Sequence, residues 1–164
     1  MAETVYFSLG TNLGNRLANL TEAIKSLSAF CRDIFSSPVY ETPPWGFIDQ
    51  PLFLNQAVRA ETDLEPLPLL TAIKSLEVDL GRQPNFLYGP RLIDIDILLY
   101  GSRVLQTGAL TIPHPMLAQR AFVLVPLAEI APGLVHPVTG KNMAALLAEL
   151  DASGVKLVPN EPTQ

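Results

Sequence analysis

The hydrophobic positions of this chain follow two periods, which divide most of it into predicted strands and helices. Runs rich in apolar and β-branched residues predict strands at residues 4–9, 31–40, 53–61 and 91–100. Apolar residues spaced three and four apart predict amphipathic helices at residues 13–27 and 64–80. In the first helix this spacing defines one apolar stripe, which includes Leu13, Leu17, Leu20 and Leu27.

The order strand, helix, strand, strand, helix, strand predicts the ferredoxin-like α+β sandwich, βαββαβ. We expect both helices to pack on one face of an antiparallel sheet, so that the other face is left for later loops or a ligand. The pattern after residue 100 predicts a hairpin partner for the last strand at 103–105, helices near Arg120 and at 143–150, and a strand at 155–158. Residues 1–159 are interpreted as a single domain and residues 160–164 as a frayed tail.

Composition narrows the class of protein. The 164 residues include 48% hydrophobic ones, which excludes global disorder. A net charge of −5 argues against broad nucleic-acid binding, and no apolar run is long enough for a membrane span. The first residues do not resemble a signal peptide, and the lone Cys31 cannot form an internal disulfide. We therefore expect a cytoplasmic monomer that binds neither nucleic acid nor membranes.

Two carboxylates stand out in the predicted strand 91–100. Asp94 and Asp96 are two residues apart, so they share one face, while the isoleucines that alternate with them share the other. Carboxylates this close repel each other unless a cation lies between them. Mg²⁺ takes oxygen ligands and leaves positions for substrate phosphates, and two such ions can clamp a phosphoryl transfer. Taken alone, a D-x-D pair more often marks a solvent-facing strand, although aspartate is depleted in strands.

Candidate cations accompany this pair. They are Arg82, Arg91 and Arg120, joined by His114 between two prolines. Arginine suits bidentate phosphate recognition, although any one of these residues alone is more often a surface cation. The chain has no Walker A motif, kinase glycine-rich loop, CxxC or HExxH motif. If ATP binds, it therefore binds through metal and arginine. His136, which lacks such neighbours, is interpreted as structural.

Several motifs occur together in one order. They are G-P-R-x-x-D-x-D at 89–96, P-H at 113–114 and R-x-F-V at 120–123, preceded by S-L-G-T-N-L-G at 8–14, Y-E-T-P-P-W-G at 40–46 and F-L-N-Q-A-V at 53–58. Together they resemble the 6-hydroxymethyl-7,8-dihydropterin pyrophosphokinase family of folate biosynthesis, over roughly residues 4–150.

The resemblance implies a ferredoxin-like fold and transfer of diphosphate from ATP to the hydroxymethyl group of the pterin, with release of AMP. It implies catalytic roles for Arg82, Arg91, Asp94 and Asp96, the two aspartates binding two Mg²⁺ ions. ATP binding is implied for Lys74, Glu77, Tyr88, Arg91, Ile97, Thr111, His114 and Arg120. Pterin binding is implied for Thr42, Pro43, Pro44, Trp45, Phe53, Asn55 and Phe122.

One segment departs from the family pattern. Residues 81–89, normally rich in arginine and lysine, carry a single cation here, Arg82. Either Arg59 or Arg103 compensates for this, or the chain is a pterin- and nucleotide-binding module with reduced or lost turnover. A structural domain without a ligand is the third hypothesis. We expect the 81–89 loop to be the most mobile segment in the absence of ligand.

Overall fold

A computed structural model describes residues 2–159, apart from 45, 47, 82–88 and 90. Its main sheet is antiparallel, with the strand order β5-β1-β4-β3-β8, and β2 also pairs with β4. The strands are β1 (Glu3–Thr11), β2 (Arg32–Ser36), β3 (Tyr40–Thr42), β4 (Phe53–Thr62), β5 (Asp94–Tyr100) and β8 (Lys156–Leu157).

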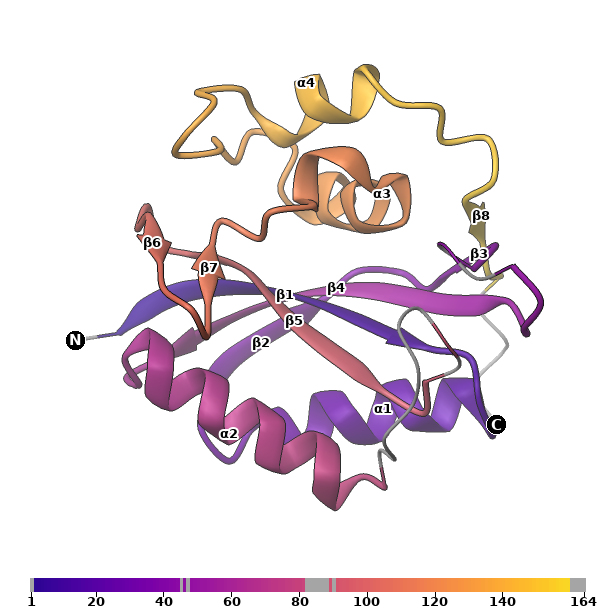
Figure 1. Ribbon diagram of the computed structural model, residues 1–164, viewed down its shortest axis with the longest axis horizontal. Coiled ribbons are helices and arrows are strands. Elements are labelled where there is room, and N and C mark those ends of the chain that lie inside the picture. Colours follow the sequence, from indigo (N-terminus) through magenta and orange to yellow (C-terminus); the bar gives the residue numbers. More distant parts are fainter. Residues whose placement is uncertain (1, 45, 47, 82–88, 90, 160–164) are drawn as a thin grey trace.

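Two layers of helices cover the sheet (Figure 1). On one face lie α1 (Arg16–Leu27) and α2 (Pro66–Asp79), and on the other lie α3 (Ala121–Ile130) and α4 (Met143–Ala148). With α1 and α2 together on one face, the strand order confirms the predicted ferredoxin-like sandwich. We call the face under α1 and α2 the closed face and the opposite one the open face.

The closed face contains the larger apolar core. Val5, Phe7 and Leu9 of β1 meet Leu20 and Leu27 of α1 there, and all five side chains are buried. The predicted stripe of α1 is wrong at its beginning, because Leu13 and Leu17 are 37% and 45% exposed. The helix starts only at Arg16, with the Asn15 side chain accepting the Ala18 N–H at 3.1 Å. Leu13 therefore precedes the helix.

Two further predictions need correction. The predicted strand 31–40 is divided into β2 and β3, because Pro38 lacks the N–H that a continuous ladder requires. Residues 103–105 do not pair with β5. Instead, β6 (Leu105–Gln106) pairs with β7 (Thr111–Ile112) in a separate two-stranded sheet. The remaining predicted elements are confirmed as α3, α4 and β8.

The strand β5 contains a β-bulge, which changes the face to which its later side chains point. Tyr6 of β1 pairs with Leu99, whereas Phe7 pairs with Ile97, so Leu98 is an extra residue. As a result, Leu98 and Leu99 both pack in a second cluster with Leu124 of α3. This cluster covers part of the open face, and the aspartate end of β5 lies outside it.

Candidate active site

A cavity of about 290 Å³ opens on the uncovered part of the open face. The strand register explains which side chains reach it. Gly10 of β1 pairs with Asp94 on one side and Asn55 on the other, and Ser8 pairs with Asp96 and Ala57. Residues directly opposite each other in a sheet point to the same face. The cavity floor is therefore made of two cross-strand rows, with β1 in the middle.

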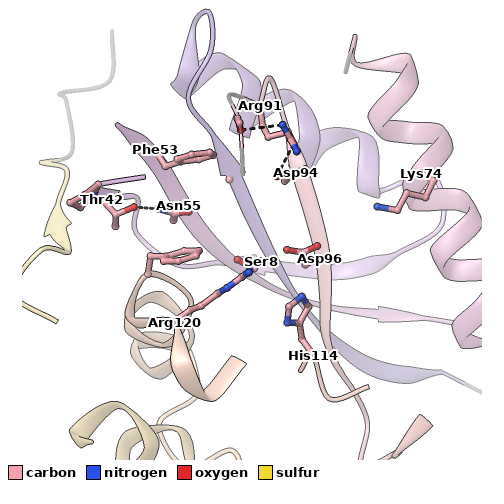
Figure 2. A pocket seen from close by; sticks show the side chains of 14 residues that line it. Ser8, Thr42, Phe53, Asn55, Lys74, Arg91, Asp94, Asp96, His114 and Arg120 are labelled. Atoms are coloured by element: carbon pink, nitrogen blue, oxygen red, sulfur yellow. Dashed lines mark hydrogen bonds and ion pairs between the residues drawn. The ribbon is translucent and has the colours of Figure 1, made fainter. Parts of the chain in front are cut away.

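The two predicted aspartates do lie on the cavity, at its β5 wall (Figure 2). The Asp94 side chain is 34% exposed, and its Oδ2 lies 3.8 Å from Arg91 Nε. Asn12 holds the Arg91 backbone from both sides: its Oδ1 accepts the Arg91 N–H at 2.7 Å, and its own N–H donates to the Arg91 carbonyl at 2.9 Å. The end of β1 therefore fixes the start of the carboxylate strand.

His114 lines the cavity, and its backbone is attached to the bulge in β5. Its N–H donates to the Leu98 carbonyl at 2.9 Å, and its Nδ1 accepts the Met116 N–H at 3.1 Å. Burial lowers the pKa of His114, Asp96 raises it, and Arg120 lowers it further. In the neutral ring with Nδ1 as an acceptor, the proton is on Nε2. His114 thus offers one N–H donor next to the aspartates.

Arg120 enters the cavity from the start of α3. It precedes the helix as its N-cap residue, and its guanidinium lies 5.6 Å from the centroid of the Phe122 ring. Figure 2 shows its side chain extending toward Ser8, between the β4 wall and Asp96. This position places a permanent positive charge between the two walls of the cavity.

The β4 wall combines aromatic and amide groups. Phe53, Phe122 and Pro43 line it. Asn55 is buried, and its Nδ2 donates to Thr42 Oγ1 at 2.6 Å. This hydrogen bond fixes the amide plane, so flat rings and one oriented amide face the cavity together.

A second cavity, of about 250 Å³, adjoins the first along the edge of β5. Lys74, Asp96 and His114 line both cavities, so the two meet at these side chains. Ile97 and Thr111 line only the second. Three of the residues predicted to bind ATP or metal therefore lie at the junction, and two more line the second cavity beside it.

Glu77 lines neither cavity. Its side chain is 1% exposed and lies beneath β5, where its Oε2 accepts the Ile95 N–H at 2.7 Å. Its Oε1 lies 3.3 Å from Lys74 Nζ. Within the described sheet β5 is an edge strand, so the Ile95 N–H faces no other described strand on that side, and the Glu77 carboxylate provides its acceptor.

Other predictions have mixed outcomes. Pro44 does not line the main cavity. Trp45, Arg82 and Tyr88, and the mobility expected for the 81–89 loop, lie outside the described residues. Of the two candidate compensating cations, Arg59 lies 5.8 Å from the Phe35 ring centroid and Arg103 contacts Glu65. Neither lines the described part of either cavity, where Lys74 is present instead.

Two floor residues, Ser8 and Gly10, are not among the site residues predicted from the sequence. Their signal was present, because they alternate with the buried Phe7 and Leu9. Within the described residues, no group of three or more His, Cys, Asp or Glu side chains is placed to hold a metal ion. Likewise, none of the described helices is long and apolar enough to cross a membrane.

Comparisons with known proteins agree with this geometry. Residues 6–132 match the model of the 7,8-dihydro-6-hydroxymethylpterin-pyrophosphokinase (HPPK) family. The 2-amino-4-hydroxy-6-hydroxymethyldihydropteridine pyrophosphokinase of Aquifex aeolicus is 46% identical, with 85% of this chain and 88% of that protein covered. The enzyme of the same name from Methylorubrum extorquens is 45% identical, with 93% and 97% covered.

A structural relative shares the fold. The HPPK-DHPS protein of Plasmodium falciparum superimposes with a TM-score of 0.78 at 17% identity, with 96% of this chain and 49% of that one covered. The present chain thus spans about half the length of that protein. The family match and the two close relatives cover most of the sequence, and the chain belongs to the 7,8-dihydro-6-hydroxymethylpterin-pyrophosphokinase family.

Proposed function

We propose that the cavity performs the reaction of this family: transfer of the β,γ-diphosphate of ATP to 6-hydroxymethyl-7,8-dihydropterin, with release of AMP, in folate biosynthesis. The observation that carries this proposal is the presence of two unlike walls on either side of β1. Aromatic rings and an oriented amide form one wall, and paired carboxylates with nearby cations form the other. Such a site suits one flat heteroaromatic ligand and one polyphosphate.

The pterin occupies the β4 wall in this proposal. The rings of Phe53 and Phe122 offer apolar faces, and the Asn55 amide offers hydrogen bonds to a polar ring edge. We assign the pterin to Thr42, Pro43, Pro44, Trp45, Phe53, Asn55 and Phe122, of which Trp45 lies outside the described residues.

ATP occupies the junction of the two cavities. The guanidinium groups of Arg91 and Arg120 and the Nε2–H of His114 bind phosphate oxygens, and the Lys74 ammonium adds a fourth positive or donor group. Ile97 and Thr111 line the nucleotide side, and we assign Arg82 and Tyr88, outside the described residues, to the same ligand. Glu77 acts indirectly, by holding Lys74 and the Ile95 backbone.

The donor set on β5 fits Mg²⁺. Two carboxylates, Asp94 and Asp96, are the acidic groups of the cavity lining, and among the described residues they form no group of three or more with other His, Cys, Asp or Glu side chains. Mg²⁺ is bound in this way, through one or two carboxylates, with water and substrate phosphates in its other positions. Two ions held here would neutralise phosphate charge and orient the reacting oxygens.

Catalysis rests on positioning and charge. The hydroxymethyl oxygen attacks the β-phosphorus of ATP, the bond from that phosphorus to the oxygen shared with the α-phosphate breaks, AMP keeps that oxygen, and one proton passes to solvent. Arg91 and Arg120 stabilise the charge on the transferring group, as phosphoryl transfer requires. His114 donates its Nε2 proton as a hydrogen bond and keeps it, because the lowered pKa favours a neutral ring.

We further propose that residues 1–159 act as one domain and that the protein is a cytoplasmic monomer. The support for a monomer is that Asp94, Asp96, Arg91, Arg120 and His114 of one chain already line a single cavity together. The lone Cys31 is buried, and burial raises the pKa of its thiol to about 11, so it is a poor nucleophile and suits a reducing compartment.

Detection of AMP tests the proposed function. The purified chain is incubated with ATP and Mg²⁺, with and without 6-hydroxymethyl-7,8-dihydropterin, and the nucleotides are separated by chromatography. We expect AMP only when all three are present, and none after EDTA is added. ADP in place of AMP would exclude diphosphate transfer. Tight binding of both ligands without AMP would favour a binding module that has lost turnover.

A further inference from the structure

The middle strand of the site, β1, lies directly between the two walls. On one side it pairs with β5 through Ser8–Asp96 and Gly10–Asp94, and on the other it pairs with β4 through Gly10–Asn55. Neighbouring strands lie about 4.8 Å apart. The aspartates and Asn55 are thus separated by about two strand spacings. Whatever group passes between a ligand on one wall and a ligand on the other must lie over β1.

This part of the floor has almost no side chains. Of the β1 residues, only Ser8 and Gly10 line the cavity. A Cβ atom added at Gly10 would lie 3.3 Å from Asn55 Oδ1 and 3.6 Å from Phe53 Cδ1, so the glycine leaves this space to a ligand. The Ser8 hydroxyl is therefore the polar side-chain group that β1 presents to the space between the walls (Figure 2).

The hydroxyl of Ser8 differs from other buried hydroxyls in the strands of the sheet and their connections. Thr11 and Thr62 donate to the carbonyls of Leu92 and Phe30, and Ser37 accepts the Ala57 N–H. Ser8 is only 8% exposed, yet its hydroxyl forms no hydrogen bond with any other residue that the structure describes. Buried polar groups are normally hydrogen-bonded, so an unused hydroxyl that faces a cavity indicates a partner in the ligand.

We propose that the Ser8 hydroxyl forms a hydrogen bond with the hydroxymethyl oxygen of the pterin and so holds the attacking atom between the two walls. This inference rests on the proposed function. With the ring on Phe53 and Asn55, its hydroxymethyl substituent extends over β1 toward Asp96, and Ser8 lies beneath that path. Ser8 is then a substrate-contacting residue that distinguishes a hydroxymethyl pterin from a methyl pterin.

A pair of ligands isolates this contact. The affinities of the wild type and of Ser8→Ala are measured by calorimetry for 6-hydroxymethyl- and 6-methyl-7,8-dihydropterin, with saturating α,β-methylene-ATP and Mg²⁺. A neutral hydrogen bond contributes about a fivefold to tenfold change in affinity. We expect Ser8→Ala to lose that factor for the hydroxymethyl compound and to bind the methyl compound within twofold of the wild type.

Three controls make the result decisive. Ser102→Ala makes the same chemical change at an exposed position and should leave both affinities unchanged. Thermal unfolding shows whether Ser8→Ala is folded, and Ser8→Cys, which keeps the shape with a weaker donor, should give an intermediate loss. AMP formation by the wild type tests the proposed function separately from the role of Ser8.

Several outcomes would overturn the inference. Equal losses for both pterins would mean that Ser8 acts on the shape of the pocket. Unchanged affinity for both pterins would mean that the Ser8 hydroxyl does not contact the pterin. A rise in the KM for ATP, with the pterin affinities intact, would assign the hydroxyl to a phosphate oxygen instead.

Discussion

The two faces of β5 are made from alternate residues of one strand segment, but they are stabilised in different ways. On the closed face, Ile93, Ile95 and Ile97 are at most 4% exposed and form part of one apolar core. On the open face, Asp94 and Asp96 line a cavity whose other walls come from β1, β4 and α3. Burial of the isoleucines holds the strand in place, and the strand in turn holds two carboxylates that repel each other.

Because of this difference, neighbouring residues of β5 should serve different purposes: the isoleucines stabilise the fold, and the aspartates serve activity. A change on the closed face removes burial, whereas a change on the open face removes charge from a partly exposed site. The hydrogen bond from the Ile95 N–H to Glu77 lies between the two, because it attaches the edge of β5 to α2 just below the aspartates.

The largest effect is expected for Asp96→Asn. The variant keeps the shape of the side chain and removes one of the two negative charges that we propose hold Mg²⁺ and, through it, the ATP phosphates, so AMP formation should fall by about a thousandfold. Without ligands, the free energy of unfolding should stay the same or rise slightly, because one repulsive charge is gone. A steady-state AMP assay and urea denaturation measure the two quantities.

Asp94→Asn is the matched variant, since Asp94 also has Arg91 Nε at 3.8 Å. It should lose activity to a similar extent and gain less stability, because it gives up an attractive contact as well as a repulsive one. A decrease in the free energy of unfolding of Asp96→Asn that is as large as the free energy equivalent of its lost activity would contradict the separation of the two faces.

On the closed face, Ile95→Ala should have the reverse effect. Ile95 is 1% exposed, and removing its buried carbons costs about 3 kcal/mol of the free energy of unfolding. Ile95 also lines the second cavity, so kcat is measured at saturating ATP. At low temperature, where the variant is still folded, this kcat should remain within a few-fold of the wild type. Ile95→Val should cost about 1 kcal/mol, which gives a graded control by urea denaturation. A loss of kcat that corresponds to the same free-energy change as the loss of stability would show that the two faces are coupled.

Much of the closed face could be predicted from the sequence, because burial leaves a periodic pattern. The alternation of isoleucine and aspartate correctly predicted which side chains of β5 lie on each face. The spacing of apolar residues by three and four correctly predicted the helix α2. The stripe of α1 failed at Leu13, where a cap at Asn15 sets the start of the helix. The position of a helix cap depends on a single hydrogen bond, so it is harder to predict from the sequence than the residues of a core.

The open face was harder to predict, because its side chains are placed by contacts between residues that are distant in the sequence. The motifs pointed to His114, but nothing local predicted the bulge at Leu98 whose carbonyl accepts the His114 N–H. Glu77 was assigned to ATP, and only the packing of α2 on the edge of β5 placed its carboxylate on the Ile95 N–H. Ser8 and Gly10 became floor residues once the register placed β1 between the two walls.

Gly10→Ala tests the open floor with a smaller effect. Gly10 does not have a positive φ, so alanine is allowed there, but its Cβ would lie 3.3 Å from Asn55 Oδ1. We expect the KM for the pterin to rise about tenfold, an effect of about 1.4 kcal/mol, with the KM for ATP and the stability nearly unchanged. Gly133→Ala, whose added Cβ would have no neighbour within 4 Å, is the control. An unchanged KM for the pterin would mean that the ligand does not use this space.

The smallest effect concerns the two histidines, one on the open face and one remote from the cavity. Burial lowers the pKa of His114 and of His136. The ordinary value, about 6.5, holds in the unfolded chain, so below it the unfolded state binds more protons than the folded state. The free energy of unfolding should therefore be fully developed above pH 6.5 and decrease as the pH falls toward 5.5, by at most about 1.4 kcal/mol per pH unit for each histidine.

Removing the charge of Asp96 on β5 should affect the two histidines differently. The Asp96 carboxylate raises the pKa of His114, against the lowering by burial and by Arg120, whereas burial alone is the cause that lowers the pKa of His136. In Asp96→Asn, NMR titration of the ring protons should show the pKa of His114 moving further down and that of His136 staying constant. A shift shared by both histidines would come from a general change of the fold. A shift confined to His114 would mean that the carboxylate and the imidazole interact across the same cavity.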